Sequence, residues 1–282
     1  MSKPKFIKKA DPAPTLSMDV LAKLESIFHD KQWSLDKTGD VPLYDRYCAT
    51  LLKISPEEQM LFLELTERFL KVDLDEYITY LEDLVYKVQT DNPNSQLILA
   101  PCLPEEELGS VKSAGVALYT MKATHYKRKV KCYIELNDIK KVLSVISDST
   151  IIVLVDDFIG TGETAVGAIE YARSVLPKEF SNDRIKIMSI VAMKQGKEQI
   201  ENLGVKLYTS YLNDKGISNY YTGDLLEKNS DLMKSIESKL SGLKPEFSFG
   251  YGQSEALVCM SRCPNNTFPI YWKGKNTAPY ER

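Results

Sequence analysis

The chain has 282 residues, of which 43% are hydrophobic and 27% charged, and its formal net charge is −3 at pH 7. That length is enough for one large core, or for a main domain with a smaller one. The slightly negative charge argues against wholesale electrostatic binding of nucleic acid. The sequence contains no apolar run long enough to cross a membrane, and its basic first nine residues lack the apolar core of a signal peptide. We therefore expect a cytoplasmic protein.

The cysteines are odd in number and scattered, which is typical of a reducing compartment. Because the chain has only two histidines, a structural zinc site has few ligands to use. We predict that the cysteines are small core residues, and we assign no residue as a direct metal ligand. The five are Cys48, Cys102, Cys132, Cys259 and Cys263.

Residues 1–92 are predicted to form a helical region. Met18 to Phe28 places its apolar residues on one helical face. Ser55 to Glu58 has the pattern of a capping box with proline in the first turn, and Asp73 to Glu76 repeats that capping pattern before another apolar face. The region could be a packing domain or a module that binds a partner protein.

Residues 93–282 have a different pattern, in which short apolar runs alternate with helical segments. This alternation predicts an α/β domain with a doubly wound, mainly parallel sheet, followed by an irregular C-terminal tail. The expected strands are 97–100, 133–136, 151–155, 185–192 and 205–210. The expected helices are 139–146, 165–172 and 197–203.

The third predicted strand and the residues after it are the most informative stretch. Ile151 to Val155 shows no polar alternation, which suits a strand that is buried on both faces. Asp156 and Asp157 follow it, and buried charge is costly, so we expect both carboxylates at the rim outside the end of the strand. Gly160 to Thr164 then forms a small turn that leads into a helix.

A glycine turn before a helix directs backbone N–H groups and the positive end of the helix dipole to one place, which suits a phosphate. Thr161 and Thr164 can add hydroxyl donors, and Gly162 and Glu163 can contribute their backbone N–H groups. Asp156 and Asp157 can accept hydrogen bonds from two sugar hydroxyls, as catalytic or substrate-binding carboxylates. The stretch therefore predicts a ribose-5-phosphate site; the alternative is a buried strand followed by an Asp-rich turn and a capped helix.

The order of hydrophobic strand, two acidic residues, two apolar residues and a small-Thr-Gly-x-Thr turn resembles the phosphoribosyl-pyrophosphate signature of type I phosphoribosyltransferases. Two positions depart from that signature. Gly160 stands where Thr or Ala is more usual, and Glu163 stands where a small residue is common.

The resemblance implies a ligand that is phosphoribosyl pyrophosphate or a nucleotide, with Mg²⁺ held by its phosphates. It implies a pentosyltransferase, a glycosyltransferase that displaces pyrophosphate at C1 of the ribose mainly by positioning and electrostatics. In such enzymes the pyrophosphate is held by a loop after an early strand and by a mobile basic loop. The matching segments here are Pro101 to Gly115, where Ser110, Lys112 and Ser113 are candidate ligands, and Met121 to Lys131.

The C-terminal tail combines turn residues, amides and aromatic rings, which suits a rim that recognises a base, or an ordered loop packed on the sheet. Phe247 to Glu255 and Cys263 to Trp272 resemble the tail of a divergent branch of phosphoribosyltransferase-like proteins associated with bacterial conflict and antiviral systems. Glu255 is a candidate acid or base within it.

Two hypotheses follow from these patterns. In the first, the protein transfers a pentosyl group as an antiviral effector, triggered by partner proteins of a defence system. In the second, it is a non-catalytic sensor that binds a nucleotide and controls a partner through the helical region. A housekeeping nucleotide-salvage enzyme is a weaker third hypothesis, because the helical region and the tail are unlike those of compact salvage enzymes.

Overall fold

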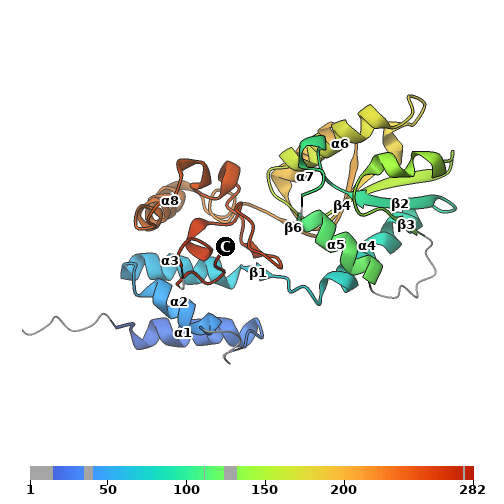
Figure 1. The fold of residues 1–282 in the computed structure, drawn as a ribbon. Coiled ribbons are helices and arrows are strands. Elements are labelled where there is room, and N and C mark those ends of the chain that lie inside the picture. Colours follow the sequence, from blue (N-terminus) through green and yellow to red (C-terminus); the bar gives the residue numbers. More distant parts are fainter. Residues whose placement is uncertain (1–14, 35–40, 111, 124–131, 276) are drawn as a thin grey trace, which may run out of the picture.

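The computed structural model describes residues 15–34, 41–110, 112–123, 132–275 and 277–282. Two lobes are visible in Figure 1, an α/β lobe and a helical lobe, with the short strand β1 (Leu70–Lys71) between them. The α/β lobe is made of the described residues between 72 and 213. The helical lobe is made of the described residues of 15–69 and 214–282, and we call those from 239 onward the tail.

The sheet of the α/β lobe contains five strands within the described residues, in the order β3-β2-β4-β5-β6, and every neighbouring pair is parallel. β4 is the central strand, and its register places Leu99 beside Val153 and Ile187 beside Leu154. The strands are β2 (Gln96–Pro101), β3 (Cys132–Ile134), β4 (Thr150–Ile159), β5 (Ile185–Met193) and β6 (Lys206–Asn213).

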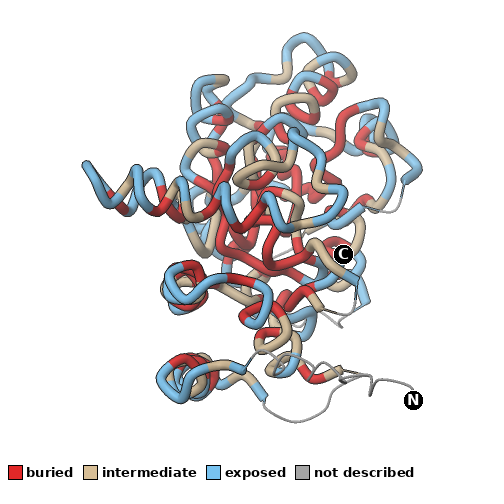
Figure 2. Tube along the Cα trace, turned by 90° about the vertical axis from the view of Figure 1, so that its left-hand side faces the viewer, coloured by how far each residue is buried: buried red, intermediate tan, exposed pale blue. Residues whose placement is uncertain are grey.

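Helices cover both faces of this sheet, so the predicted doubly wound α/β class is confirmed. One face packs against α4 (Tyr77–Asp91) and α5 (Ser113–Ala123), and the other against α6 (Glu163–Val175) and α7 (Lys194–Asn202). Consecutive residues of β4 alternate between the two apolar clusters, as the period of a strand requires. Figure 2 shows buried residues gathered in the interior of the molecule, with exposed residues around them.

The helical lobe joins residues from distant parts of the chain in one apolar cluster. Its helices are α1 (Met18–Asp30), α2 (Leu43–Leu51), α3 (Pro56–Glu67) and α8 (Gly223–Ser238). Phe28, Tyr47 and Phe62 of the first three helices pack with Tyr271 and Tyr280 of the tail, and ring pairs such as Phe69 and Tyr280 stack with centroids 5.1 Å apart. Aromatic packing therefore holds the tail against the N-terminal helices.

The two lobes are joined along a pair of short strands. β1 pairs in parallel with β7 (Val258–Cys259), and the Leu70 and Val72 N–H groups donate to the carbonyls of Leu257 and Cys259. Around β7, Leu257 and Cys259 belong to the helical cluster, whereas Val258 belongs to the sheet cluster. Near residue 70 the chain thus passes from the helical cluster to the sheet cluster, and α4 packs on the sheet. The domain boundary expected after residue 92 stays a prediction.

Two local expectations differ from the structure, and a third is confirmed. The helix expected over 139–146 is a 3₁₀ helix, Ile139–Val145. Asp73 does not cap α4, which begins at Tyr77 with Glu76 as its N-cap; instead the Asp73 carboxylate pairs with Lys71, and the Asp73 N–H donates to Glu76 Oε2. Ser55 does cap α3, as the sequence predicts: its hydroxyl accepts a hydrogen bond from the Glu58 N–H, and its own N–H donates to the Glu58 carboxylate.

The cysteines are all free thiols, three of them buried. Among the described helices, none has both the length and the apolar composition of a membrane-spanning segment. The basic segment His125 to Lys131, predicted as part of a mobile loop, lies outside the described residues.

Candidate functional site

A cavity of about 650 Å³ opens at the carboxyl end of β4. Cavities of roughly 300–1,000 Å³ hold small ligands in other proteins. Its walls come from the end of β4 and the turn after it, the loop before α5, and the tail. The cavity therefore lies at the edge of the parallel sheet where α/β proteins bind ligands.

Asp156 and Asp157 belong to β4 itself, which continues to Ile159, so the expectation that they follow the strand at its rim was wrong. Their side chains are 8% and 4% exposed and still line the cavity. Ser113 Oγ and the Asp157 N–H both donate to Asp156 Oδ1, at 2.6 and 2.8 Å. The Tyr77 hydroxyl donates to Asp157 Oδ2 at 2.6 Å. Burial is tolerated because each carboxylate accepts hydrogen bonds.

The charged form of Asp156 is electrostatically unfavourable. Burial raises the pKa of the Asp156 carboxyl well above its ordinary range, and the neighbouring Asp157 carboxylate raises it further. Burial and Asp157 also raise the pKa of the Tyr77 hydroxyl, which keeps it a hydrogen-bond donor. The like charge of Asp157 thus adds to the cost of ionising the buried Asp156 carboxyl.

The turn after β4 is built for close packing. Gly162 has φ +94°, in the left-handed region, and is the N-cap of α6. A β-carbon at Gly196, in the first turn of α7, would lie 2.5 Å from the Gly160 carbonyl oxygen. Thr161, Gly162, Glu163 and Thr164 all line the cavity, as predicted for a phosphate turn at a helix N-terminus.

The two departures from the signature both face the tail. A β-carbon at Gly160 would lie 2.3 Å from Asn266 Nδ2, so the tail occupies the space that Thr or Ala would need. The Glu163 carboxylate accepts a hydrogen bond from the Tyr251 hydroxyl, 2.9 Å away. Gly252 likewise leaves room for the methyl group of Thr161, which would lie 2.4 Å from a β-carbon there. The turn and the tail have complementary shapes.

The tail segment that contacts the turn is itself rigidly hydrogen-bonded. Asn266 Nδ2 donates to Ser254 Oγ and to the Tyr251 carbonyl, at 2.9 and 3.2 Å. Glu255, a candidate acid or base, is 3% exposed, and its carboxylate accepts from the N–H groups of Ile217 and Ser218. Glu255 does not line the cavity, so its role is to hold the tail on the segment before α8.

The loop between β2 and α5 forms the opposite wall. Lys112 lines the cavity, but its ammonium group pairs with Glu107 Oε1 at 3.0 Å. Ser113 is used to position Asp156, and the Ser110 hydroxyl donates to the Glu107 carbonyl. The candidate pyrophosphate ligands of this loop therefore have partners within the protein.

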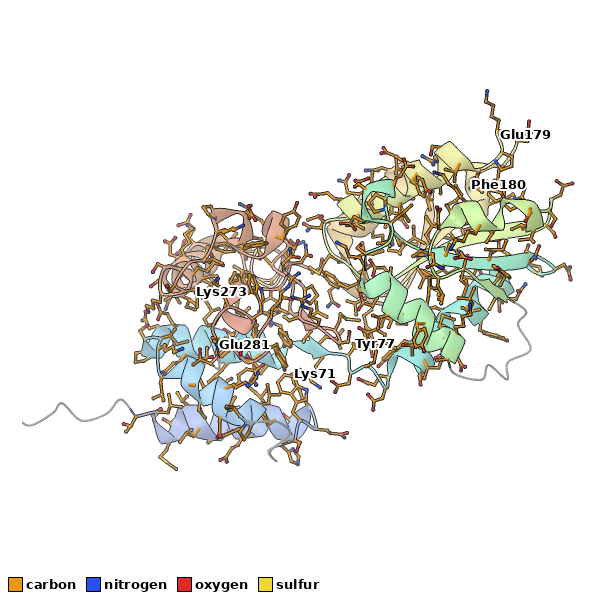
Figure 3. All side chains as sticks on the ribbon, in the orientation of Figure 1. Lys71, Tyr77, Glu179, Phe180, Lys273 and Glu281 are labelled. Carbon is orange, nitrogen blue, oxygen red and sulfur yellow. The ribbon has the colours of Figure 1, made fainter. Side chains whose placement is uncertain are left out.

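Some residues in the cavity wall or bonded to it belong to no motif that the sequence reveals. Tyr77 is separated from Asp157 by 80 positions, and Figure 3 shows it near the junction of the lobes. Arg262 and Arg282 line the cavity from the tail. Only the high proportion of turn residues and rings in the tail indicated that this segment forms a rim.

A parallel sheet with an acidic pair and a glycine-threonine turn at the end of its central strand defines a phosphoribosyltransferase-like protein. The chain matches the PRTase-CE family model over residues 57–282 and belongs to that family. No curated protein matches the chain.

Solved phosphoribosyltransferases are similar to part of the chain. Orotate phosphoribosyltransferase from Aeropyrum pernix is 18% identical, with a TM-score of 0.27, over 46% of this chain and 67% of that one. The Mycobacterium tuberculosis H37Rv orotate phosphoribosyltransferase in complex with inorganic phosphate is 17% identical, with a TM-score of 0.29 and the same two coverages. The Giardia lamblia APRTase complexed with 9-deazaadenine is 15% identical, with a TM-score of 0.29, over 47% and 79%.

Proposed function

We propose that the cavity binds the ribose-5-phosphate part of phosphoribosyl pyrophosphate or of a nucleotide. The observation that carries this proposal is that the acidic pair of β4 and the turn Gly160–Thr164 line one cavity of ligand size. The phosphate would accept hydrogen bonds from the N–H groups at the start of α6 and from the Thr161 and Thr164 hydroxyls. Asp156 and Asp157 would accept from the ribose hydroxyls.

Pentosyl transfer is the reaction that this arrangement suits. When pyrophosphate leaves C1, positive charge develops on the ribose ring, and a negative carboxylate beside the ring stabilises it. Asp157, positioned by Tyr77, can supply that charge, while Asp156 is positioned by Ser113. The chain would thus act by holding and polarising the sugar, without a covalent intermediate on a side chain.

Mg²⁺ fits this site only as a companion of the ligand. Within the described residues there is no group of three or more His, Cys, Asp or Glu side chains that could hold a metal ion. The two cavity aspartates could contribute oxygen ligands, but most of the coordination would come from phosphate oxygens and water. Mg²⁺ would neutralise the leaving pyrophosphate.

We further propose that the protein is a bacterial antiviral effector that acts in the cytoplasm with partner proteins of a defence system. The support is the resemblance of Phe247 to Glu255 and Cys263 to Trp272 to the tail of the conflict-associated branch. The family match includes both segments, and both are packed on the site rather than apart from it.

A specific observation favours the alternative, a non-catalytic nucleotide sensor that controls a partner protein. Lys112, the candidate cation of the predicted pyrophosphate loop, is already paired with Glu107. A site that binds ribose and phosphate but lacks a group for the leaving pyrophosphate would bind a nucleotide without turnover.

The test measures ligand binding and pyrophosphate release separately. The protein is incubated with phosphoribosyl pyrophosphate, Mg²⁺ and pools of bases or nucleotides, and calorimetry follows ribose 5-phosphate binding. We expect Asp157→Asn to abolish turnover and weaken binding, whereas Asp148→Asn, an exposed aspartate before β4, is the matched control and changes neither. Binding without pyrophosphate release would support the sensor, and binding that is unchanged in Asp156→Asn/Asp157→Asn would refute the assignment of the site.

A further inference from the structure

We propose that Arg262 and Arg282 form a second anion site in the same cavity, which binds the phosphate or diphosphate carried on the far side of the ribose. Both side chains are exposed and line the cavity from the tail. Its connection to a ribose ligand rests on the proposed function; the anion site itself does not.

Hydrogen bonds hold the backbone just before Arg262 close to the acidic pair. Tyr77 donates to Asp157 and accepts from the backbone N–H of Ser261, over 2.6 and 3.0 Å. Ser261 directly precedes Arg262, and it follows Met260, which is packed in the sheet cluster. The backbone that carries Arg262 is therefore held one hydroxyl group away from the Asp157 carboxylate.

The phosphate turn provides little positive charge of its own. It offers backbone N–H groups and hydroxyls, and the Glu163 carboxylate beside it is bonded to Tyr251. That set suits one phosphate group at a helix N-terminus. A second phosphate or a diphosphate on the other side of the sugar needs cations that the turn does not supply.

The arginines are the cations left for this role. Three basic side chains line the cavity among the residues that the structure describes, namely Lys112, Arg262 and Arg282. Lys112 is paired with Glu107, whereas neither arginine has an ion pair among those same residues. Two guanidinium groups facing one cavity offer planar forks of N–H donors that match phosphate oxygens.

The two guanidinium groups also repel each other. Partial burial lowers the pKa of the exposed Arg282, and the positive charge of Arg262 lowers it further. Like charges brought together without a counter-ion are unfavourable, and a bound anion between them would remove the repulsion. The tail thereby supplies the group for a leaving pyrophosphate that the loop between β2 and α5 lacks.

Inorganic pyrophosphate is the probe that isolates this site. Calorimetric titration at low salt is expected to show that pyrophosphate binds to the wild-type protein. Its affinity should fall about tenfold or more in Arg262→Ala, and by a similar factor in Arg282→Ala, because each change removes charge-assisted hydrogen bonds. Arg262→Lys should retain part of the affinity. Lys228→Ala, which removes an exposed charge from α8, is the matched control and should bind as the wild type does. Circular dichroism verifies that the variants are folded.

Titration with ribose 5-phosphate distinguishes the proposed anion site from the proposed ribose site. Its affinity should stay within about twofold in both arginine variants, whereas phosphoribosyl pyrophosphate should lose affinity as pyrophosphate does. Absence of pyrophosphate binding, or equal affinity in wild type and Arg262→Ala/Arg282→Ala, would overturn the proposal. Arginine-dependent pyrophosphate binding without ribose 5-phosphate binding would support the anion site and refute the proposed ribose grip.

Discussion

Gly160 provides a sharp test of the contact between the phosphate turn and the tail. A β-carbon at this position would lie 2.3, 2.4 and 2.6 Å from the Nδ2, Cγ and Oδ1 atoms of Asn266. The backbone of Gly160 is not in the left-handed region, so the cost of Gly160→Ala comes from that clash rather than from φ. We expect the variant to be less stable although alanine is the more favourable residue in most contexts.

The magnitude follows from what Asn266 must give up. To make room, its amide has to leave Ser254 Oγ and the Tyr251 carbonyl. Each hydrogen bond contributes about 0.5–1.5 kcal/mol, so their loss costs about 1–3 kcal/mol. A glycine-to-alanine change also reduces the conformational freedom of the unfolded chain, which stabilises the folded protein by about 0.4–1 kcal/mol. The expected net loss is about 1–2 kcal/mol in the free energy of unfolding.

A double-mutant cycle measured by urea denaturation tests this reasoning. Asn266→Ala removes the obstruction, so Gly160→Ala should cost little in that background, and the two changes should be strongly non-additive. Gly115→Ala is the matched control: it lies in α5, a β-carbon there meets nothing within 4 Å, and we expect about 0.5–1 kcal/mol of stabilisation. Additive costs of Gly160→Ala and Asn266→Ala would refute the argument.

Asp156→Asn should raise the melting temperature at neutral pH. The raised pKa of Asp156 means that its charged form is disfavoured in the folded state, so the wild type loses stability as the pH rises above the ordinary aspartate pKa of about 3.9. The gain from Asn should shrink as the pH falls toward that value, and a gain that is independent of pH would contradict this. Tyr77→Phe should lower the free energy of unfolding by about 1–3 kcal/mol in urea, since Asp157 loses its donor and the Ser261 N–H its acceptor; no loss would show that the contact is not maintained. Glu255→Gln should cost about 1.5–3 kcal/mol by the same measurement, yet leave ribose 5-phosphate affinity within about twofold; a large loss of affinity with unchanged stability would restore a role in the site.

The sheet and the phosphate turn could be predicted because local patterns determine them. The apolar run Ile151 to Val155 needs two covered faces, and the glycine-threonine turn has one plausible use at a helix N-terminus. The length of β4 could not be predicted, because aspartates are tolerated inside a strand only when donors such as Tyr77 and Ser113 reach them. Those donors come from distant segments.

The tail shows the same limit. Its rings and amides indicated a rim, but nothing local places Asn266 against Gly160 or Tyr251 against Glu163. The sequence alone indicates a chemical role for Glu255, because it is a lone carboxylate among turn residues and could serve as an acid or base. Only the three-dimensional structure shows that the Ile217 and Ser218 N–H groups donate hydrogen bonds to that carboxylate.

The pairing of β1 with β7, which joins the two lobes, affects the order in which the chain can fold during biosynthesis. The first three helices pack with one another and with residues 217–280, so as the chain leaves the ribosome part of their apolar surface stays uncovered until those later residues have been made. The α/β lobe can form first, since its strands and covering helices lie within residues 72–213. Exposed apolar faces of nascent chains are prone to aggregation and bind chaperones. The part of the cavity wall that the tail supplies is made after the α/β lobe, so a chain whose synthesis stops before residue 262 would carry the acidic pair and the phosphate turn without the arginines.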